Sequence, residues 1–200
     1  YCIHVDANAD IQVFVTMKAV AGCFENVLLA SRRDRVVYRG FSVLKAHINC
    51  MLDLLEMKHS WNYNINLPGT VLPLHSNEEI VDILKVYNGT SDIQGFFGGN
   101  REKLEWRWLN EYREVNISTS HPAVEKTGNL NPPAPHGIRI VYGQGYGIYS
   151  REFLQFAFHD TIPKDLLEWA KNTYCPDEIY FPTLYNTAHN PQIKAPKAYK

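Results

Sequence analysis

Apolar residues in the first half of the chain form short continuous runs that alternate with longer stretches of helical spacing. The short runs predict strands, because a strand buried on both faces is continuously apolar; they cover residues 1–5, 26–30 and 61–67. The longer stretches predict helices, because their apolar residues recur near the helical period; they cover residues 11–21, 42–57 and 80–87. This alternation favours an α/β fold with a mostly parallel sheet.

The pattern changes after residue 87. Residues 88–136 are rich in Gly, Asn, Pro, Ser and Thr, which predicts a loop-rich region. Further strands and helices are predicted beyond it, at 138–142, 146–149, 150–157 and 163–172. Ligands of an open α/β sheet bind beyond the carboxyl ends of its strands. That rule points to Asp6, to residues 31–33 and to the turn at 68–73.

Composition and charge narrow the class of protein. Hydrophobic residues make up 45% and charged residues 20%, which is enough apolar material for a real core. Lys and Arg total 20 against 21 Asp and Glu, so the net charge is -1. A nucleic-acid binder that neutralises phosphates normally has a basic excess, and this class is therefore disfavoured. No apolar run reaches the roughly 18 residues that a membrane span needs.

The cysteines and two sequons bear on the cellular compartment. Cys2, Cys23, Cys50 and Cys175 form no C-x-x-C pair, so a structural zinc site is not expected. A disulfide between two of them is possible, but the composition does not select the pair. Sequons at Asn88 and Asn116 would accept N-glycans if the chain passed through the secretory pathway.

Several side chains have both a structural and a chemical interpretation. Asp6 ends a strand, where a carboxylate either caps the next turn or accepts hydrogen bonds from a ribose or base. The Tyr38 ring either packs in the core or stacks on a flat ligand. Glu178 lies just after a proline that would begin a helix. Its carboxylate there either interacts with the helix dipole or acts as a general base.

An aromatic and basic cluster interrupts the loop-rich region. Trp106, Arg107 and Trp108 suit a sugar, because aromatic rings meet the apolar C–H faces and Arg meets the hydroxyls. A small satellite core is the equally supported alternative. Glu111 and Glu114 are expected on a solvated face. The chain has no Asp-x-Asp, the pair with which many sugar-nucleotide enzymes hold a divalent cation.

Ordered motifs along almost the whole chain resemble one family. They are YCIHVD at 1–6, VLLASR at 27–32, VVY at 36–38, INCM at 48–51, INL at 65–67, SRE at 150–152 and PDE at 176–178. In this order and spacing they resemble the core-2/I-branching β-1,6-N-acetylglucosaminyltransferases, a family that also contains the protein O-xylosyltransferases. The INCM and PDE motifs fit the branching enzymes better than the xylosyltransferases.

The resemblance implies a partial catalytic domain with a GT-A-like, Rossmann-type α/β fold, truncated at both ends. Residues 1–87 would be the half that binds the nucleotide sugar, and residues 88–200 the half that binds the acceptor and holds the catalytic base. The full-length enzymes are type II Golgi membrane proteins with a lumenal catalytic domain, so the membrane anchor would precede this chain. They transfer a sugar from a UDP donor to a glycan acceptor with inversion, and need neither a metal nor another cofactor.

The resemblance also assigns roles to individual residues. Asp6 and Tyr38 match positions that hold the uridine, and Glu178 matches the catalytic base. The acceptor would be contacted by Arg107, Trp108 and Gln94. Cys2 and Cys50 match a family disulfide, and the partner of Cys23 would lie upstream.

The function expected from this resemblance is transfer of GlcNAc from UDP-GlcNAc, in β-1,6 linkage, to a Gal- or GalNAc-containing acceptor. Xylosyl transfer to a serine is the enzymatic alternative. The non-enzymatic alternative is a degenerate relative that only binds sugars. Val71 keeps that last alternative open, because the family usually has an acid at this position.

Overall fold

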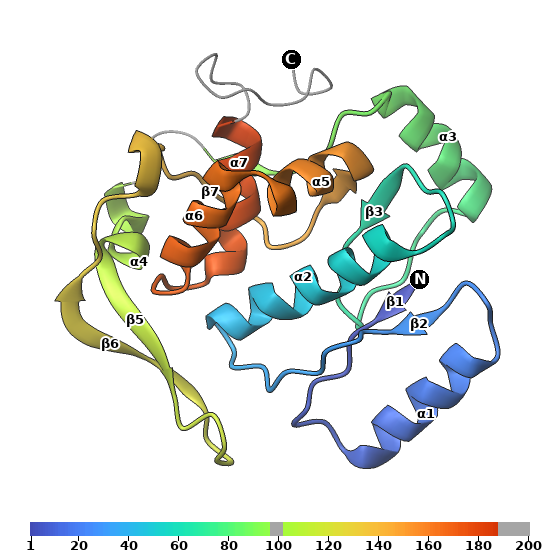
Figure 1. Cartoon of the computed structure of the whole chain (residues 1–200), viewed down its shortest axis with the longest axis horizontal. Coiled ribbons are helices and arrows are strands. Elements are labelled where there is room, and N and C mark those ends of the chain that lie inside the picture. Colours follow the sequence, from blue (N-terminus) through green and yellow to red (C-terminus); the bar gives the residue numbers. More distant parts are fainter. Residues whose placement is uncertain (97–101, 188–200) are drawn as a thin grey trace. The chain divides into compact units, whose positions relative to one another are not determined.

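The computed structural model describes residues 1–96 and 102–187 (Figure 1). The chain divides into two compact units, and each is built from three separate segments. Unit 1 contains Tyr1–His59, Glu102–Pro133 and Glu168–Asp177. Unit 2 contains Ser60–Arg101, Ala134–Leu167 and Glu178–Lys200. The functional halves expected at 1–87 and 88–200 do not coincide with these units, because each half contributes segments to both. The assignment of functions to the two halves stays a prediction.

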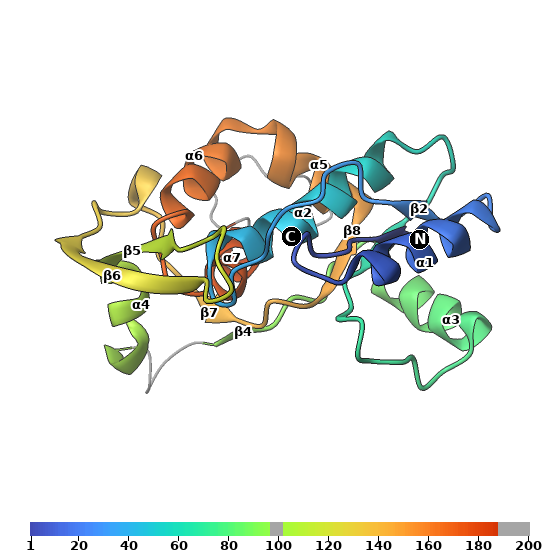
Figure 2. The same ribbon diagram turned by 90° about the horizontal axis from the view of Figure 1, so that it is seen from below.

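The first segment of unit 1 has the predicted alternation of strand and helix. Strand β1 (Cys2–Ile3) pairs in parallel with β2 (Leu28–Leu29), and α1 (Ile11–Gly22) connects them. Figure 2 shows α1 beside this pair. The strands are much shorter than their apolar runs, because only two residues of each have a ladder partner.

Helix α2 (Phe41–Glu56) is the best-packed helix of this segment. It is predicted by its apolar spacing, and it buries residues along one face: Ser42, Leu44, Ala46, Ile48, Asn49 and Met51. Its Cys50 is bonded to Cys2 of β1, with Cα atoms 5.6 Å apart. The disulfide implied by the family resemblance is therefore confirmed.

The middle segment of unit 1 forms a hairpin where a loop-rich region was expected. The short helices η1 (Glu102–Leu104) and α4 (Trp106–Leu109) precede β5 (Asn110–Val115), which pairs antiparallel with β6 (Ala123–Leu130). The loop prediction is thus wrong for residues 110–115 and 123–130. Most of β6 is exposed, so its sequence lacks the alternation of apolar residues that reveals a half-buried strand.

Unit 2 contains only antiparallel pairs among its described strands. Strand β3 (Tyr63–Ile65) pairs with β8 (Ile148–Ser150), and β4 (Gly95–Phe96) pairs with β7 (Tyr142–Gly143). The expected mostly parallel sheet is therefore not what the described residues form, because the single parallel pair is β1 with β2. Short apolar runs do not encode strand direction, which depends on partners distant in sequence.

The helices of unit 2 differ in packing. Helix α5 (Arg151–His159) begins at the Ser150 N-cap. Helix α7 (Tyr180–Thr187) contains Pro182 and lies just after Pro176, where the sequence predicts the start of a helix. Together with β8 they hold an aromatic core in which several side chains have no exposed surface: Tyr149, Phe153, Tyr180 and Phe181. A short helix, η2 (Pro135–Gly137), precedes β7, while α6 (Thr161–Ala170) and η3 (Pro176–Glu178) each extend across the border between the units.

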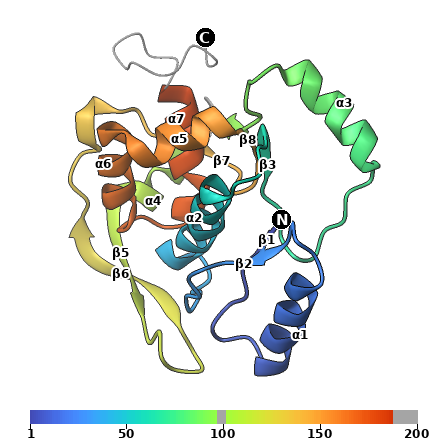
Figure 3. The same ribbon diagram turned by 45° about the vertical axis from the view of Figure 1, so that its right-hand side comes forward.

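Helix α3 (Asn77–Tyr87) is the exception in unit 2, because it buries none of its residues. Figure 3 shows it at the end of a long connection from β3. A predicted capping box begins it: the Ser76 hydroxyl accepts from the Glu79 N–H, and the Glu79 carboxylate accepts from the Ser76 N–H. Local capping and helical propensity therefore contribute more to α3 than burial does. Within the described part of the chain, no helix has the length and apolarity needed to cross a membrane.

Candidate functional site

Asp6 joins the end of β1 to the segment that carries Tyr38. Its Oδ1 accepts hydrogen bonds from the backbone N–H of Asn8, at 2.8 Å, and from that of Val36, at 3.1 Å. These bonds are the capping of the next turn, which is one of the two interpretations that the sequence allows for Asp6. It also fixes the start of the 36–40 loop relative to β1.

Arg33 has a structural role. Its guanidinium donates to the carbonyls of Val5 and Asp6, at 3.2 and 3.0 Å, and lies 4.5 Å from the centre of the Phe14 ring. Arg33 therefore ties the loop after β2 to the loop after β1, which are two of the three places to which the parallel-sheet rule points.

Tyr38 lies at the tip of the 36–40 loop with 77% of its surface exposed. The neighbouring Arg39 has a positive φ of 69°, and its guanidinium lies 4.9 Å from the Tyr38 ring centre. The same guanidinium is 5.6 Å from the ring centre of Tyr174. An exposed ring supported from one side by a cation is able to stack on a planar group.

Glu114 anchors this loop to the hairpin. Its Oε1 accepts from the Ser42 backbone N–H at 2.6 Å and from the Ser42 hydroxyl at 2.7 Å. The same hydroxyl oxygen accepts from the Val37 N–H at 2.7 Å. A Cβ added to Gly40 would lie 2.2 Å from that carboxylate oxygen. The expectation that Glu114 lies on a solvated face is wrong, because its partner lies 72 residues away in the sequence.

The aromatic cluster of unit 1 consists of Trp106, Tyr112 and Tyr174. Ring centres are 5.0 Å apart for Trp106 and Tyr174, and 5.2 Å apart for Tyr112 and Tyr174. The guanidinium of Arg107 lies 5.5 Å from the Trp106 ring and 5.7 Å from the Tyr174 ring. Burial raises the pKa of the Tyr112 hydroxyl above its ordinary value.

The two tryptophans of this region differ in accessibility. Trp106 is 41% exposed, whereas Trp108 is 5% exposed and belongs to the core. Both interpretations of the cluster therefore describe part of it, with Trp108 in a satellite core and Trp106 as a surface ring. The acceptor contact predicted for Trp108 stays a prediction, and Trp106 has more surface for such a contact.

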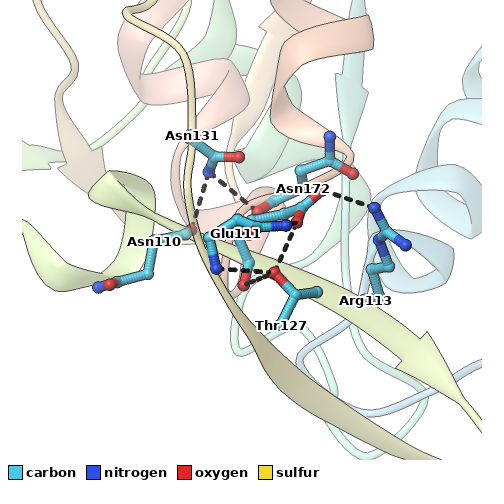
Figure 4. Close-up of polar contacts among 7 residues, drawn as sticks. Asn110, Glu111, Arg113, Thr127, Asn131 and Asn172 are labelled. Atoms are coloured by element: carbon cyan, nitrogen blue, oxygen red, sulfur yellow. Dashed lines mark hydrogen bonds and ion pairs between the residues drawn. The ribbon is translucent and has the colours of Figure 1, made fainter.

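Glu111 is hydrogen-bonded to other side chains of the hairpin (Figure 4). Its carboxylate accepts from the Thr127 hydroxyl at 2.5 Å, from Asn129 Nδ2 at 2.9 Å and from the Arg113 guanidinium at 2.9 Å. These hydrogen bonds, Thr127 first, lower the Glu111 pKa to about 2. The prediction of a solvated Glu111 is therefore wrong, and the residue links β5 to β6.

Asn131 connects the end of the hairpin to the segment after α6. Its Nδ2 donates to the carbonyls of Asn110 and Asn172, at 2.8 and 3.0 Å, as Figure 4 shows. The Asn172 carbonyl also accepts from the Tyr112 N–H at 2.9 Å. These bonds fix the position of the hairpin relative to the segment between α6 and Tyr174.

Glu178, the predicted base, is half-buried at the end of η3. The chain enters η3 through Cys175, which has a positive φ of 52° and donates its N–H to the Arg39 carbonyl at 2.9 Å. The segment just before Glu178 is thus hydrogen-bonded to the loop that carries Tyr38. The role of Glu178 as base stays a prediction.

Gln94 of unit 2 is exposed next to β4. Its carbonyl packs against Gly143 of β7 so closely that a Cβ at position 143 would lie 1.9 Å from the carbonyl oxygen. Gly143 is therefore required by this close approach. The acceptor contact of the Gln94 side chain stays a prediction.

Across residues 1–96 and 102–187, no group of three or more His, Cys, Asp and Glu side chains is placed to hold a metal ion. Metal independence remains a prediction of the family resemblance.

Comparison with known proteins decides the family. The sequence profile of the core-2/I-branching enzymes matches residues 1–198. The chain belongs to the core-2/I-branching enzyme family. It is 36% identical over 198 residues to the mouse N-acetyllactosaminide β-1,6-N-acetylglucosaminyl-transferase, covering 99% of this chain and 49% of that enzyme. It is 35% identical over 184 residues to the human β-1,3-galactosyl-O-glycosyl-glycoprotein β-1,6-N-acetylglucosaminyltransferase 3, covering 92% of this chain and 40% of that enzyme.

These values confirm the family that the sequence motifs resemble. The chain spans half or less of the length of these curated relatives. Within this branching-family chain, sequence reasoning missed Arg39, Glu114 and the packing of Tyr174. Their partners are far away in the sequence, so no local spacing could have identified them.

Proposed function

We propose that the protein containing this chain transfers GlcNAc from UDP-GlcNAc to a Gal- or GalNAc-containing glycan, in β-1,6 linkage and without a metal, in the Golgi lumen. The observation that carries this proposal is the family match over residues 1–198, with relatives named as β-1,6-N-acetylglucosaminyltransferases. The enzyme would act as an inverting glycosyltransferase in the branching of O-glycans.

In the proposed step, Glu178 takes the proton of the acceptor hydroxyl as its oxygen attacks the anomeric carbon of GlcNAc. The bond from that carbon to the diphosphate oxygen breaks, and UDP leaves with the electron pair. Attack from the face opposite the leaving group inverts the anomeric configuration. With a single displacement, one carboxylate is sufficient as base.

The described geometry is compatible with the donor and acceptor roles. Tyr38 offers an exposed ring for the uracil, on a loop whose start is fixed by Asp6. Arg107 and Trp106 offer a cation beside a surface ring, a combination that suits a sugar. All four residues lie in unit 1, where ring and guanidinium contacts connect the Tyr38 loop through Arg39 to Tyr174 and on to Arg107.

The deciding experiment measures transfer by the complete protein that contains this chain. UDP-GlcNAc, UDP-GalNAc and UDP-xylose are each offered with a Galβ1-3GalNAc acceptor, a polylactosamine acceptor and a serine peptide, with and without EDTA. We expect GlcNAc transfer that persists in EDTA. Xylose transfer to the peptide would support the xylosyltransferase alternative, and donor binding with no transfer would support the degenerate one.

The role of Glu178 has a separate test. Glu178→Gln should lower turnover by roughly 10²-fold or more with little change in UDP binding, because the amide cannot accept the proton. Glu125→Gln, on the exposed part of β6, is the matched control and should retain activity. Near-normal turnover of Glu178→Gln would leave Glu178 with a structural role only.

A further inference from the structure

Unit 2 contains a cavity of about 640 Å³ that lies outside the site described above. It is bounded by the end of α3, the start of α5 and strand β3. Its lining includes Asn62, Tyr63, Lys85, Asn88, Arg151 and Gln155. None of these residues has a predicted donor, acceptor or catalytic role. This volume lies within the range that is usual for small-molecule binding sites.

The lining chemistry favours a carbohydrate. Amide, ammonium and guanidinium groups supply hydrogen bonds for hydroxyl and acetamido groups, and Tyr63 supplies one aromatic ring. A sugar has both an apolar C–H face and several hydroxyls, which this combination matches.

A glycosylation sequon lies at the rim of the cavity. Asn88 of the sequon Asn88-Gly89-Thr90 is exposed, has left-handed backbone angles and itself lines the cavity. Its turn is fixed: the Gly89 N–H donates to the Tyr63 hydroxyl at 2.5 Å, and the Thr90 N–H donates to the Tyr87 carbonyl at 2.9 Å. A sugar bonded to Nδ2 of Asn88 would therefore begin at the edge of the cavity.

Helix α3 is the element that such a sugar would stabilise. It buries none of its own residues, and Val86 is 82% exposed. The contacts at its C-terminal end are a hydrogen bond from the Tyr87 hydroxyl to Asp92, at 2.9 Å, and an edge-on contact of Tyr87 with Tyr63. A covalently attached sugar that fills the space between α3 and α5 would add contacts that α3 lacks.

We propose that Asn88 carries an N-glycan whose first GlcNAc residue docks in this cavity and holds α3 against α5. The step that attaches it uses a lipid-diphosphate oligosaccharide and the oligosaccharyltransferase of the endoplasmic reticulum. A bond forms between Nδ2 and the anomeric carbon of GlcNAc, and the amide loses one proton. The bond from that carbon to the diphosphate breaks, and the lipid diphosphate leaves with the electron pair.

The proposal rests on the proposed function in one respect, which is the passage of the chain through the secretory pathway. The Cys2–Cys50 disulfide is an independent observation in the same direction, because disulfides persist in oxidising compartments.

The test compares glycoforms of the complete protein, purified from mammalian cells treated with a mannosidase inhibitor. The first form has intact glycans, and the second is trimmed with endoglycosidase H to a single GlcNAc. The third is Thr90→Ala, which cannot be modified at Asn88. Mass spectrometry gives the occupancy of Asn88, and hydrogen exchange gives the protection of residues 77–87. We expect Asn88 to be occupied and exchange in α3 to be several-fold slower in the first two forms than in Thr90→Ala.

Three variants serve as controls. Thr90→Ser keeps the sequon and should keep the protection. Ser118→Ala removes the sequon of Asn116, which does not line the cavity, and should leave α3 unchanged. Gln155→Ala should accelerate exchange in α3 in the glycosylated protein but not in the Thr90→Ala background, because it acts through the docked sugar.

An unoccupied Asn88, or equal exchange of α3 in all three glycoforms, would overturn the proposal. Transferase activity is measured on the same preparations. Transfer with equal exchange would reject the docked glycan alone, whereas slow exchange without any transfer would reject the proposed function alone.

Discussion

Helices α2 and α3 show how differently two amphipathic segments of one chain are stabilised. Helix α2 buries six residues, is bonded to β1 through Cys50, and has its first turn held by Glu114. Helix α3 has the better-capped start, with both bonds of a capping box, yet it buries nothing. Capping thus determines where a helix begins, whereas tertiary contacts determine how firmly it is held.

The largest expected effect comes from removing the disulfide of α2. The double variant Cys2→Ser and Cys50→Ser should lose about 4 kcal/mol of unfolding free energy, because the bridge closes a loop of 48 residues. Urea unfolding measures this loss. Glu125→Gln, at an exposed position of β6, is the control. An equal loss in that control would mean that the bridge itself contributes little.

The next largest difference is expected between truncations of apolar side chains in α2 and in α3. Leu44→Ala in α2 should cost about 2–5 kcal/mol, because the side chain is fully buried and leaves a cavity. Val86→Ala in α3 should change the stability by less than about 0.5 kcal/mol, since that side chain is exposed. Comparable losses from the two variants would contradict the contrast between the helices.

Glu114 should show a coupling to Gly40. Glu114→Ala should cost about 2 kcal/mol, because it leaves the buried Ser42 groups without their carboxylate acceptor. Gly40→Ala should be destabilising in the native protein, where its Cβ would meet the carboxylate, and much less so in the Glu114→Ala background. If the losses of unfolding free energy in this double-mutant cycle were strictly additive, the Glu114 side chain would make room for a Cβ at position 40 at no cost, and the coupling would be absent.

The last expected effect is a dependence of the stability on pH through α2. Burial, with the charge of His4 as a second cause, lowers the pKa of His47 to about 4 from the usual 6.5. The unfolded chain then binds the proton more readily, so stability is complete above about pH 6.5 and falls as the pH drops toward 4. The loss should approach about 1 kcal/mol per pH unit in that window.

Urea unfolding at a series of pH values measures the effect of His47. His47→Gln should flatten the dependence, and His59→Gln, at an exposed position, should leave it unchanged. A dependence of the same slope in His47→Gln would assign it to other groups.

Sequence reasoning succeeded where the determinants are local. The spacing of apolar residues located α2 closely, and the S-x-x-E pattern located the start of α3. It failed where long-range pairing decides, as for the direction of the strands and for the exposed strand β6. The same limit applies to the candidate site: Asp6, Tyr38 and Glu178 came from the family motifs. The roles of Arg39 and Glu114 depend on partners 72 or more residues away, Tyr174 for Arg39 and Ser42 for Glu114, and no local pattern reveals such partners.

The disulfide between Cys2 and Cys50 also has a consequence for the order of events during synthesis. Both cysteines leave the ribosome before the other segments of unit 1, which is incomplete until residue 177 has been made. At ordinary translation rates the 118 residues from 60 to 177 take about 6–24 s. During that wait the bridge holds the first segment together without its hairpin. Cys23 lies between the two bonded cysteines and is exposed, so until it is bonded to the upstream partner that the family resemblance implies, its thiol is placed to exchange with the bridge.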